Sequence, residues 1–428
     1  MDEFPADKRA GQALARPQVV ILGAGFGGLS AATALRHAPV DITLIDRRNY
    51  HLFQPLLYQV ATAGLSPAQI ASPIRRIVSR QKNVTVLMDK IVAIDKSASE
   101  VVTSKRRIHF DYLIVATGAR HAYFGHEQWE EFAPGLKKID EATEIRRRIL
   151  LAFEQAEATV DENERRRSLT FVVVGGGPTG VEMAGAIAEL AHRTIVHDFR
   201  HINPTQTQII LVEAGSRILP AFPDKLSESA ARQLSRLGVT VMTEAAVTDC
   251  GNDGITLRDG RRIETATIIW AAGVMASPAG KWLEAQCDRA GRVVVDATLR
   301  LPGSDNTFVI GDTAIVTDVN GITVPGIAPA AKQMGYFAAG SILGDLKGSP
   351  RRKFKYRNYG NLATFGRSSA VADFGGFTLS GFPAWLIWCF AHIWFLIGFR
   401  NRLVVFLDWI VAYVSFNRGV RLITGGEN

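Results

Sequence analysis

Residues 19–31 read VVILGAGFGGLSA, and this stretch decides the fold that the sequence predicts. The four residues Val19–Leu22 are all apolar, as is typical of a buried parallel strand. A G-x-G-x-x-G pattern follows at Gly23, Gly25 and Gly28, and an apolar helix begins directly after it. A strand, a glycine-rich turn and a helix N-terminus in this order form a cradle whose backbone N–H groups bind a pyrophosphate. The stretch therefore predicts a dinucleotide-binding α/β unit.

An acidic residue supports this interpretation. A second strand-like run, residues 42–45, ends at Asp46, which lies 23 residues beyond Gly23. A carboxylate at the end of that strand is placed to accept hydrogen bonds from ribose hydroxyls. A glycine-rich turn alone is weak evidence, because such a turn often serves only the chain's own geometry. The acid makes a nucleotide site the better explanation.

The same arrangement recurs about 150 residues later. Residues 170–182 read TFVVVGGGPTGVE, with glycines of the pattern at Gly175, Gly177 and Gly180. The acid after the next strand is Glu213, 38 residues beyond Gly175, which is longer than the usual spacing of about 20. We therefore expect a helical insertion near residues 192–203. The repeat predicts a duplicated nucleotide-binding unit and a doubly wound α/β architecture.

Two cradles in one chain predict two dinucleotides, between which an enzyme can transfer a hydride. A further strand ends in Gly311-Asp312, the pattern with which flavoproteins of two dinucleotide-binding domains hold FAD. Residues 116–118, Ala-Thr-Gly, and 271–273, Ala-Ala-Gly, match the turns that such proteins place beside the flavin and the nicotinamide. We predict an FAD-binding domain over 17–128 and 276–345, an NADH-binding domain over 129–275, and a C-terminal region over 350–428.

Longer stretches carry a more specific resemblance. They are DRRNYHLFQPLLYQVAT at 46–62, Gly180-Val181-Glu182, and YGNLATFGR at 359–367. With these stretches the chain resembles type II NADH dehydrogenases, the single-subunit NADH:quinone oxidoreductases that do not pump protons. The resemblance covers residues 17–425.

The resemblance implies a role for particular residues. FAD would be held by Gly23, Gly25, Gly28, Asp46, Thr117, Gly118, Asp312 and Gln333. NADH would be held by Gly175, Gly177, Gly180, Glu182, Glu213 and Gly273. Glu182, between nicotinamide and flavin, and Gln333, beside the flavin, would be the catalytic pair; the simpler alternative for Glu182 is a glutamate stabilised by its helix dipole.

The family's quinone motif, Ala-Gln-x-Ala-x-Gln, departs from its pattern in this chain. Residues 328–333 read APAAKQ, so that Pro329 stands where the family has its first glutamine, whereas Gln333 matches. Quinone contact at position 329 is therefore in question. Either ubiquinone or menaquinone fits the sequence equally well.

Other chemistries are excluded or less favoured. The disulfide reductases of this superfamily carry a cysteine pair after the first cradle, but no cysteine precedes Cys250. The cysteines are also too scattered for a metal site or a disulfide framework, and we expect no metal. Two alternatives remain: a soluble NADH:ferredoxin-type reductase, or one with another acceptor, and a flavin-bearing signalling protein that binds NADH without useful turnover.

The C-terminal region combines apolar and basic residues. From Pro350 onward ten Lys and Arg stand against three acids, which accounts for +7 of the formal net charge of +8. The residues 374–399 carry no formal charge. Apart from Arg402 near their start, the residues 401–415 are apolar except for one helical face with small or polar side chains at 401, 408, 412 and 415. Because the basic residues stand among Trp, Phe and Leu, they indicate an anionic lipid surface rather than nucleic acid.

These features predict a peripheral, monotopic protein that lies on the membrane. One transmembrane helix within 379–399 is the alternative, and part of the apolar surface would also suit a homodimer. The first residues lack the apolar core of a signal peptide, so we expect the cytoplasmic face of a bacterial-type inner membrane. Arg400, Arg402, Arg418 and Arg421 flank the helical segment and would meet lipid phosphates.

Overall fold

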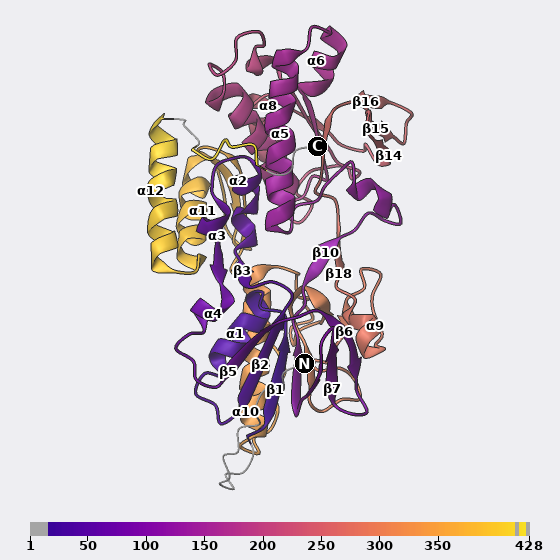
Figure 1. The fold of residues 1–428 in the computed structure, drawn as a ribbon, viewed down its shortest axis with the longest axis vertical. Coiled ribbons are helices and arrows are strands. Elements are labelled where there is room, and N and C mark those ends of the chain that lie inside the picture. Colours follow the sequence, from indigo (N-terminus) through magenta and orange to yellow (C-terminus); the bar gives the residue numbers. More distant parts are fainter. Residues whose placement is uncertain (1–15, 416–418, 425–428) are drawn as a thin grey trace, which may run out of the picture. The chain divides into compact units, whose positions relative to one another are not determined.

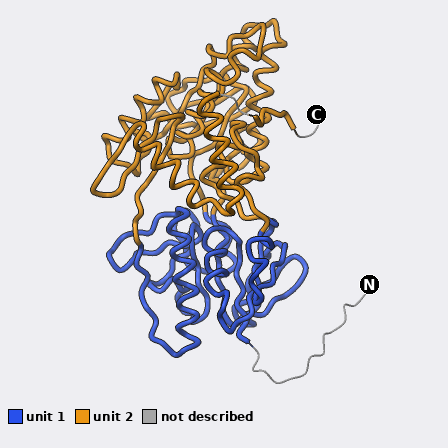
Figure 2. Tube along the Cα trace, turned by 90° about the vertical axis from the view of Figure 1, so that its left-hand side faces the viewer, with its two compact units in different colours: residues 1–49, 74–118, 276–356 blue, residues 50–73, 119–275, 357–428 orange. Residues whose placement is uncertain are grey.

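A computed structural model describes residues 16–415 and 419–424. These residues form two compact units, shown in different colours in Figure 2. Unit 1 contains the residues up to 49 together with 74–118 and 276–356, and unit 2 contains 50–73, 119–275 and the residues from 357 onward. This division differs from the predicted domain boundaries, because residues 50–73 and 119–128 belong to unit 2, as do the residues of the C-terminal region from 357 onward.

Unit 1 is built on a five-stranded parallel sheet (Figure 1). Its order is β20 (Thr307–Val309), β9 (Tyr112–Val115), β1 (Gln18–Leu22), β2 (Asp41–Asp46) and β5 (Val84–Met88). The register pairs Leu22 with both Ile45 and Val115, so three strands end at the same edge. The segments that follow them therefore meet at one place, the carboxyl edge, where ligands of such sheets bind.

Two helices of unit 1 pack directly against each other, α1 (Phe26–Ala34) and α10 (Ala328–Asp345). Their backbones approach so closely that a Cβ at Gly335 would lie 2.2 Å from the carbonyl oxygen of Gly27. The remaining elements of the unit are α4 (Ile74–Ile77), α9 (Ala279–Leu283), the 3-10 helix η5 (Gly311–Thr313), an antiparallel sheet of β6 (Ile91–Asp95), β7 (Glu100–Thr103) and β8 (Arg107–His109), and the pair β19 (Val293–Val294) and β21 (Ala314–Ile315).

Unit 2 repeats the parallel architecture. Its four-stranded sheet has the order β13 (Val239–Met242), β12 (Gln208–Val212), β11 (Thr170–Val174) and β17 (Thr267–Trp270). Val174 pairs with Val212 and with Trp270, the same register relation as at Leu22 in unit 1. The helices are α5 (Ile139–Ala158), α6 (Glu162–Ser168), α7 (Pro178–Glu189) and α8 (Asp224–Arg236), and β14 (Val247–Gly251), β15 (Gly254–Leu257) and β16 (Arg262–Glu264) form an antiparallel sheet. The predicted α/β class with two Rossmann-like sheets is confirmed.

The predicted helical insertion between the second cradle and Glu213 is wrong. A π-helical turn, Leu190–Thr194, ends α7, and most of the following residues up to 203 form turns and bends. The carboxylate of Glu157 on α5 accepts hydrogen bonds from the backbone N–H groups of Arg200, His201 and Ile202. One acidic side chain thus accepts hydrogen bonds from three backbone N–H groups of the loop. In a helix these N–H groups would bond to backbone carbonyl oxygens instead.

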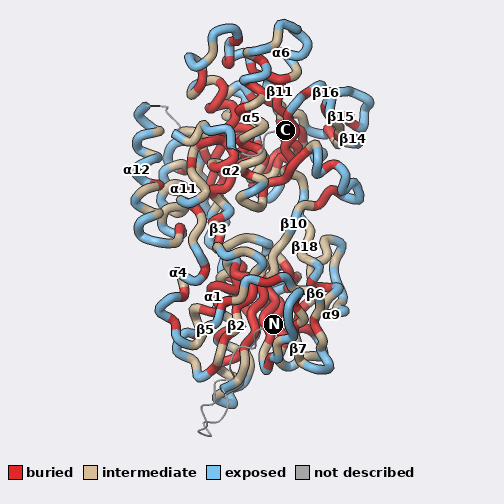
Figure 3. Tube along the Cα trace, viewed as in Figure 1, coloured by how far each residue is buried: buried red, intermediate tan, exposed pale blue. Residues whose placement is uncertain are grey.

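The C-terminal region forms a third layer on unit 2. Strands β22 (Asn361–Gly366), β23 (Ser369–Asp373) and β24 (Thr378–Ser380) make an antiparallel sheet that contacts α7 and α8, and α11 (Phe382–Phe395) packs against β23. The last helix, α12 (Phe399–Ser415), contacts α11 and α3 (Pro67–Ile70). Most of α12 is exposed (Figure 3).

The apolar run 374–399 does not form one long helix. It contains a strand, the 14 residues of α11, and an extended Leu396, and Gly398 has a φ of +91°. Within the described residues, no helix combines the length and the hydrophobicity needed to cross a membrane. The alternative of one transmembrane helix within 379–399 is therefore wrong.

The segment 50–73 contributes β3 (Tyr50–Leu52), the short helices η1 (Gln54–Leu56), α2 (Leu57–Ala61) and α3, and β4 (Ala71–Pro73). Strands β3 and β4 pair antiparallel, and α2 packs against α5 and α7. The sequence predicted an ordered loop with short helices at this place. Because β3 and β4 at its two ends pair with each other, the segment folds back on itself. Its helix α2 lies against α7, the helix of the second cradle.

Because the C-terminal sheet packs closely on α7, one additional methyl group on this helix should destabilise the protein. A Cβ at Gly185 would lie 2.0 Å from the carbonyl oxygen of Phe365 in β22, so Gly185→Ala must displace the sheet. We expect a loss of about 1–3 kcal/mol in the free energy of unfolding. Gly340→Ala, at an exposed position of α10, is the matched control; a Cβ there has nothing within 4 Å and should stabilise by up to about 1 kcal/mol. Urea unfolding of both variants tests the difference, and equal stabilities would show that β22 yields freely.

Candidate active site

The first glycine turn is fixed by contacts that leave no room for side chains. Gly23 has a φ of +95°, and a Cβ there would lie 2.4 Å from the carbonyl oxygen of Ala116. A Cβ at Gly28 would lie 1.8 Å from the carbonyl oxygen of Gly23. At Gly25, by contrast, a Cβ would meet nothing within 4 Å. Two glycines thus close the turn against the strand and helix, and the third leaves space on the side from which a ligand approaches.

The acid of the first unit holds the same turn. One oxygen of the Asp46 carboxylate accepts a hydrogen bond from the N–H of Ala24 at 2.7 Å, and the other accepts one from the N–H of Arg48 at 2.8 Å. The N–H of Gly23 donates to the carbonyl of Ile45 at 2.7 Å. The structure therefore brings together the predicted residues of the first cradle.

The second cradle repeats this geometry almost bond for bond. Gly175 has a φ of +107°, and a Cβ at Gly180 would lie 1.8 Å from the carbonyl oxygen of Gly175. Gly177 is open within 4 Å, as Gly25 is. The Glu213 carboxylate accepts from the N–H of Gly176 at 2.6 Å and from that of Gly215 at 2.7 Å. Unit 2 has a glutamate where unit 1 has an aspartate. Each acid stands at the end of the strand beside the cradle strand and holds the glycine turn of its own unit.

Three other predicted residues of unit 1 meet near the carboxyl edge. The N–H of Gly118 donates to the hydroxyl of Thr313 at 2.8 Å, and the hydroxyls of Thr117 and Ser277 are hydrogen bonded. Asp312 precedes Thr313 in η5. Sequence reasoning missed Thr313 and Ser277, although the first follows Gly311-Asp312 directly.

In unit 2, Gly273 also has a left-handed backbone, with a φ of +75°. A Cβ there would lie 2.5 Å from the ring of Phe124, an exposed aromatic side chain that the sequence did not single out. The glycine therefore allows a ring to lie against the turn that follows β17. The backbone of this turn begins with the N–H of Ala271, which donates to the carbonyl of Val174 at 2.8 Å.

Helix α10 carries the altered quinone motif. Pro329 lies in the first turn of this helix, where the missing N–H of a proline costs no intrahelical hydrogen bond. Gln333 follows one turn later and is half-buried, and it belongs to unit 1 together with the first cradle. The structure thus explains how proline is accommodated at position 329.

Glu182 is set into unit 2 on the helix of the second cradle. The residue is half-buried, but its carboxyl group is enclosed by protein atoms, and this burial raises its pKa well above the usual range of a glutamate. The backbone N–H of Thr364 in β22 acts in the opposite direction and lowers the pKa. A buried carboxyl group that favours its protonated form is typical of a group that gives or takes a proton during a reaction.

The sequence patterns did not single out Tyr58, a second buried titratable group of unit 2. Tyr58 on α2 is buried, and burial together with the negative charge of Glu182 raises the pKa of its hydroxyl group. Its hydroxyl oxygen accepts a hydrogen bond from the side chain of Gln59 at 2.9 Å. Both residues belong to the stretch 46–62 that carried the family resemblance, so the position of that stretch was the available signal.

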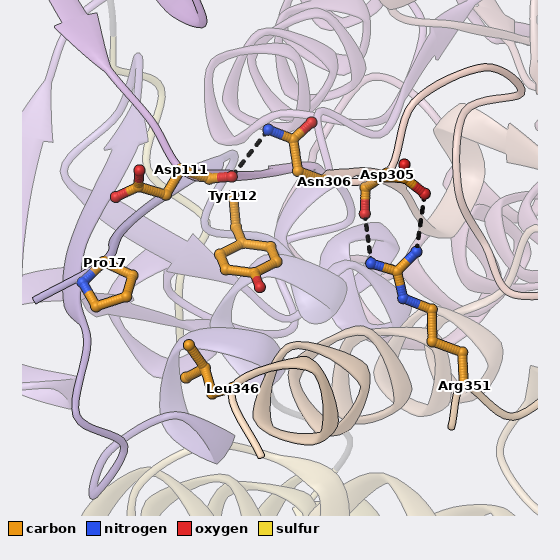
Figure 4. Close-up of a pocket in the computed structure, with 7 residues that line it drawn as sticks. All are labelled: Pro17, Asp111, Tyr112, Asp305, Asn306, Leu346 and Arg351. Carbon is orange, nitrogen blue, oxygen red and sulfur yellow. Dashed lines mark hydrogen bonds and ion pairs between the residues drawn. The ribbon is translucent and has the colours of Figure 1, made fainter. Parts of the chain in front are cut away.

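A cavity of unit 1 with a volume of about 370 Å³ lies away from the cradle. Its lining residues stand where β9 and β20 begin (Figure 4), whereas the cradle lies at the carboxyl edge of the sheet. The side chains that line it are tied to one another: Asn306 donates to the carbonyl of Asp111, and Arg351 to that of Asp305. These contacts join loops at the edge of the sheet, so the cavity adds nothing to the cofactor chemistry.

Metal and disulfide chemistry find no support in the described chain. Its His, Cys, Asp and Glu residues form no group of three that would hold a metal ion. The three cysteines are free; Cys250 is buried, Cys287 is exposed, and Cys389 lies on α11.

Comparisons with known proteins agree with this geometry. Residues 17–335 match the family Pyridine nucleotide-disulphide oxidoreductase, and residues 359–417 match the NDH2 C-terminal domain. The type II NADH:quinone oxidoreductase Ndh of Mycobacterium tuberculosis is 46% identical over 98% of this chain and 93% of its own length. This chain belongs to the type II NADH:quinone oxidoreductases. NdhA of the same organism, with the same descriptive name, is 47% identical over 96% of this chain and 90% of its own.

A solved structure of NDH2 from Plasmodium falciparum in complex with NADH shares the fold of this type II enzyme. Its TM-score is 0.87 at 21% identity, and the match covers 96% of this chain and all of the other. A sulfide:quinone oxidoreductase of Aquifex aeolicus matches with a TM-score of 0.74 at 19% identity, over 93% of this chain and 95% of the other. The predicted family and enzyme class are confirmed.

The two open glycines allow each cradle to be tested separately. Gly25 and Gly177 both have a φ of −70°, so alanine at either position fits the backbone and the protein around it. If a pyrophosphate passes over each turn, Gly25→Ala should lower the flavin content, whereas Gly177→Ala should raise KM for NADH at least about tenfold. Flavin absorbance, steady-state kinetics and thermal unfolding measure these effects. Normal flavin content and normal KM in both variants would place the ligands elsewhere.

Proposed function

We propose that this protein oxidises NADH with a bound FAD and passes two electrons to a membrane quinone without pumping protons. The observation that carries this proposal is the pair of matched cradles in one chain whose C-terminal region matches that of NDH2 proteins. A single cradle would serve one nucleotide, whereas two allow a hydride donor and a hydride acceptor to be held by one enzyme. Unit 1 would bind FAD and unit 2 would bind NADH.

The residues around the first cradle fit an adenine dinucleotide such as FAD. Gly25 offers the open backbone that a pyrophosphate requires, and the N-terminus of α1 supplies positive dipole toward it. Asp46, Thr117, Gly118 and Asp312 would bind the ribose and the rest of the cofactor, and Gln333 would contact the ring system. When bound, FAD supplies two-electron chemistry that accepts a hydride and releases electrons to a quinone.

In unit 2, Gly175, Gly177 and Gly180 would bind the NADH pyrophosphate, and Gly273 would leave room for the nicotinamide. Glu182 would lie beside the nicotinamide with its carboxyl group protonated, because its burial favours the neutral form. NADH delivers two electrons and one proton, and a quinol needs two protons. Glu182 would carry the second proton inward from water.

The acid of the second cradle favours NADH over NADPH. The Glu213 carboxylate would accept hydrogen bonds from the adenosine ribose and would repel a 2′-phosphate. Arg217 is the nearby cation that a 2′-phosphate would need, but it donates to the backbone of Phe222 and Pro220 and pairs with Asp224. The guanidinium of Arg217 therefore bonds to the segment that leads into α8.

The exposed face of α11 and α12 would be the membrane-binding surface. Its side chains are large and apolar, and about half or more of each is exposed in Leu386, Phe390, Trp394, Phe399, Leu403, Phe406, Leu407, Val411 and Val414. Most soluble proteins do not expose so many large apolar side chains together. We infer a peripheral attachment to a lipid surface, at the cytoplasmic face of an inner membrane, and a homodimer through part of the same surface stays a prediction.

Lipid contacts were predicted for four arginines, but two of the four are bonded within the protein. Arg402 donates to the carbonyl of Leu396 at 2.7 Å, and Arg421 pairs with Asp198, so these two stabilise the protein itself. Arg418 lies outside the described residues. Arg400 is exposed at the start of α12 and remains the proposed contact for anionic headgroups.

The two other functions are less well supported. A ferredoxin-type reductase has no use for the apolar face of α11 and α12, and a signalling protein has no use for a buried, protonated Glu182 on the helix of the second cradle. NADH oxidation by the purified holoenzyme, with a long-tailed quinone and with ferredoxin as acceptors, tests the choice. Turnover with neither acceptor would favour the binding protein.

Cofactor preference gives the next prediction. Glu213→Gln should narrow the ratio of kcat/KM for NADH over NADPH by at least about tenfold, mostly through KM, since a hydrogen bond to a charged group is lost. Asp46→Asn is the matched control, because it makes the same change in the equivalent acid of unit 1. It should lower flavin content and leave the NADH/NADPH ratio unchanged. A wild-type enzyme that uses both cofactors equally would contradict the role given to Glu213.

Membrane attachment is testable without removing the C-terminal region, which packs on α7. Phe390 and Val411 are 69% and 58% exposed, so the double variant Phe390→Glu, Val411→Glu keeps the core intact. It should no longer float with vesicles that contain anionic phospholipid, because two charges would enter the lipid interface. Val160→Glu, at a position 95% exposed between α5 and α6, should bind vesicles like the wild type. Flotation of the double variant would refute this surface.

A further inference from the structure

Phe124 in unit 2 is an exposed aromatic residue in an unusual backbone conformation. It is 66% exposed and has a φ of +55°, in the left-handed region that residues with a Cβ rarely adopt. Gly125 follows with a φ of +93°, and the N–H of His126 donates to the carbonyl of Tyr123 at 3.0 Å. Two left-handed residues closed by this hydrogen bond have the pattern of a type I′ turn, in which Gly, Asn and Asp dominate. The turn itself therefore does not explain a phenylalanine at its first central position.

The residues before Phe124 are fixed against the end of β17. The indole N–H of Trp270, the last residue of that strand, donates to the carbonyl of Ala122 at 2.9 Å. The ring of Tyr123 stacks on that of Trp270 with centroids 5.2 Å apart, and the Tyr123 hydroxyl donates to the carbonyl of Ala133 at 2.8 Å. Phe124 therefore extends from an anchored backbone.

The ring of Phe124 lies on the turn that abuts the second cradle. A Cβ at Gly273 would lie 2.5 Å from Cζ of this ring. The same turn reaches the cradle, because a Cβ at Gly175 would lie 2.7 Å from the backbone nitrogen of Ala272. An exposed phenylalanine alone has no special meaning, since every protein surface exposes apolar atoms. Here, however, the ring lies on a turn that touches a nucleotide site, and most of the residue's surface is free.

The order of the strands indicates which half of NADH would meet this ring. Strand β11 lies between β12 and β17, so the glycine turn after β11 has Glu213 on one side and the turn 271–273 on the other. With the adenosine ribose at Glu213 and the pyrophosphate at Gly177, the rest of the molecule extends toward β17. Phe124 is thus on the nicotinamide side of the second cradle.

We propose that Phe124 is a further substrate-binding residue, whose ring packs against the nicotinamide half of NADH. This inference rests on the proposed binding of NADH to unit 2 and names the contact for one half of that molecule. An aromatic side chain offers a large contact area with only two rotatable bonds, so that little freedom is lost on binding. Two aromatic rings in contact favour an offset-stacked or an edge-to-face arrangement, and either needs a ring with a free surface.

Phe124→Asn separates binding from folding. Asparagine tolerates a left-handed backbone, so the variant should unfold at the temperature of the wild type or above it. Loss of the ring should raise the Kd for NADH about five- to tenfold, the effect of one aromatic contact. Stopped-flow reduction of the flavin in the holoenzyme gives this Kd from the dependence of the rate on NADH concentration. ADP contains the adenosine and both phosphates but lacks the nicotinamide half, so its inhibition constant should not change.

Two further variants serve as controls. Phe124→Tyr keeps the ring and should keep the Kd of the wild type. Phe377→Asn removes a ring that is 58% exposed in the segment between β23 and β24, and it should change neither the Kd for NADH nor the inhibition constant of ADP. Binding of ADP also decides the case in which a variant is less stable, because it reports whether the cradle is intact.

The inference and the function on which it rests fail in different ways. An unchanged Kd for NADH in Phe124→Asn, an equal increase in Phe124→Tyr or Phe377→Asn, or an equal weakening of NADH and ADP would each overturn the inference. In the last case the ring would only support the fold of the cradle. A wild-type holoenzyme that does not reduce quinones with NADH, or a Gly177→Ala variant that binds NADH and ADP normally, would instead overturn the proposed function or its NADH site.

Discussion

The rest of the structure depends on one close approach, in which the backbone of a helix's first turn touches the carbonyl oxygen at the end of the preceding strand. A Cβ would lie 1.8 Å from that oxygen at Gly28, and again 1.8 Å at Gly180. Only glycine allows this contact, and it directs the helix N-terminus at the edge where the neighbouring strands end. An acid from the next strand then holds the turn by its backbone N–H groups in both units. Contacts within the chain therefore fix the shape of each cradle.

The parts of the fold governed by this local geometry were predictable from the sequence. The strands around both cradles, the two acids and the turn at Thr117 lie where the patterns placed them, because each is fixed by residues close in sequence or by strict alternation of strand and helix. The stretch after α7 was mistaken for a helix, since nothing local reveals that Glu157, more than forty residues away on α5, would satisfy its backbone. Domain boundaries differed for a similar reason. The segment 50–73 belongs to unit 2 through its contacts with α5, α7 and α12.

The C-terminal helices show a second limit of sequence patterns. The polar stripe of α12 was recognised correctly, and in an interfacial helix such a stripe would normally face water. Here part of it contacts the protein: Asp408 bonds to Gln69, and Asn401 donates to the hydroxyl of Ser72 at 3.4 Å, whereas Ser415 is exposed. The adjacent Trp409 bonds to Gln59. The apolar side is consequently turned outward. Periodicity reveals that a helix has two faces, but only the partners of each face decide which one is buried, and those partners lie over 300 residues earlier in the chain.

Helix α7 is held both by the glycine turn of the second cradle and by the C-terminal sheet. Its first turn belongs to the second cradle, and its next turns face strand β22 with residues three and four positions apart, the spacing of one helical face. Glu182 receives the N–H of Thr364, Gly185 abuts the carbonyl of Phe365, and Glu189 accepts from the N–H of Arg367. A helix pinned at its N-terminus by a nucleotide turn and along its side by a sheet has little freedom to shift. The carboxyl group of Glu182 is thus positioned by the second cradle and the C-terminal sheet together, and both belong to the same compact unit.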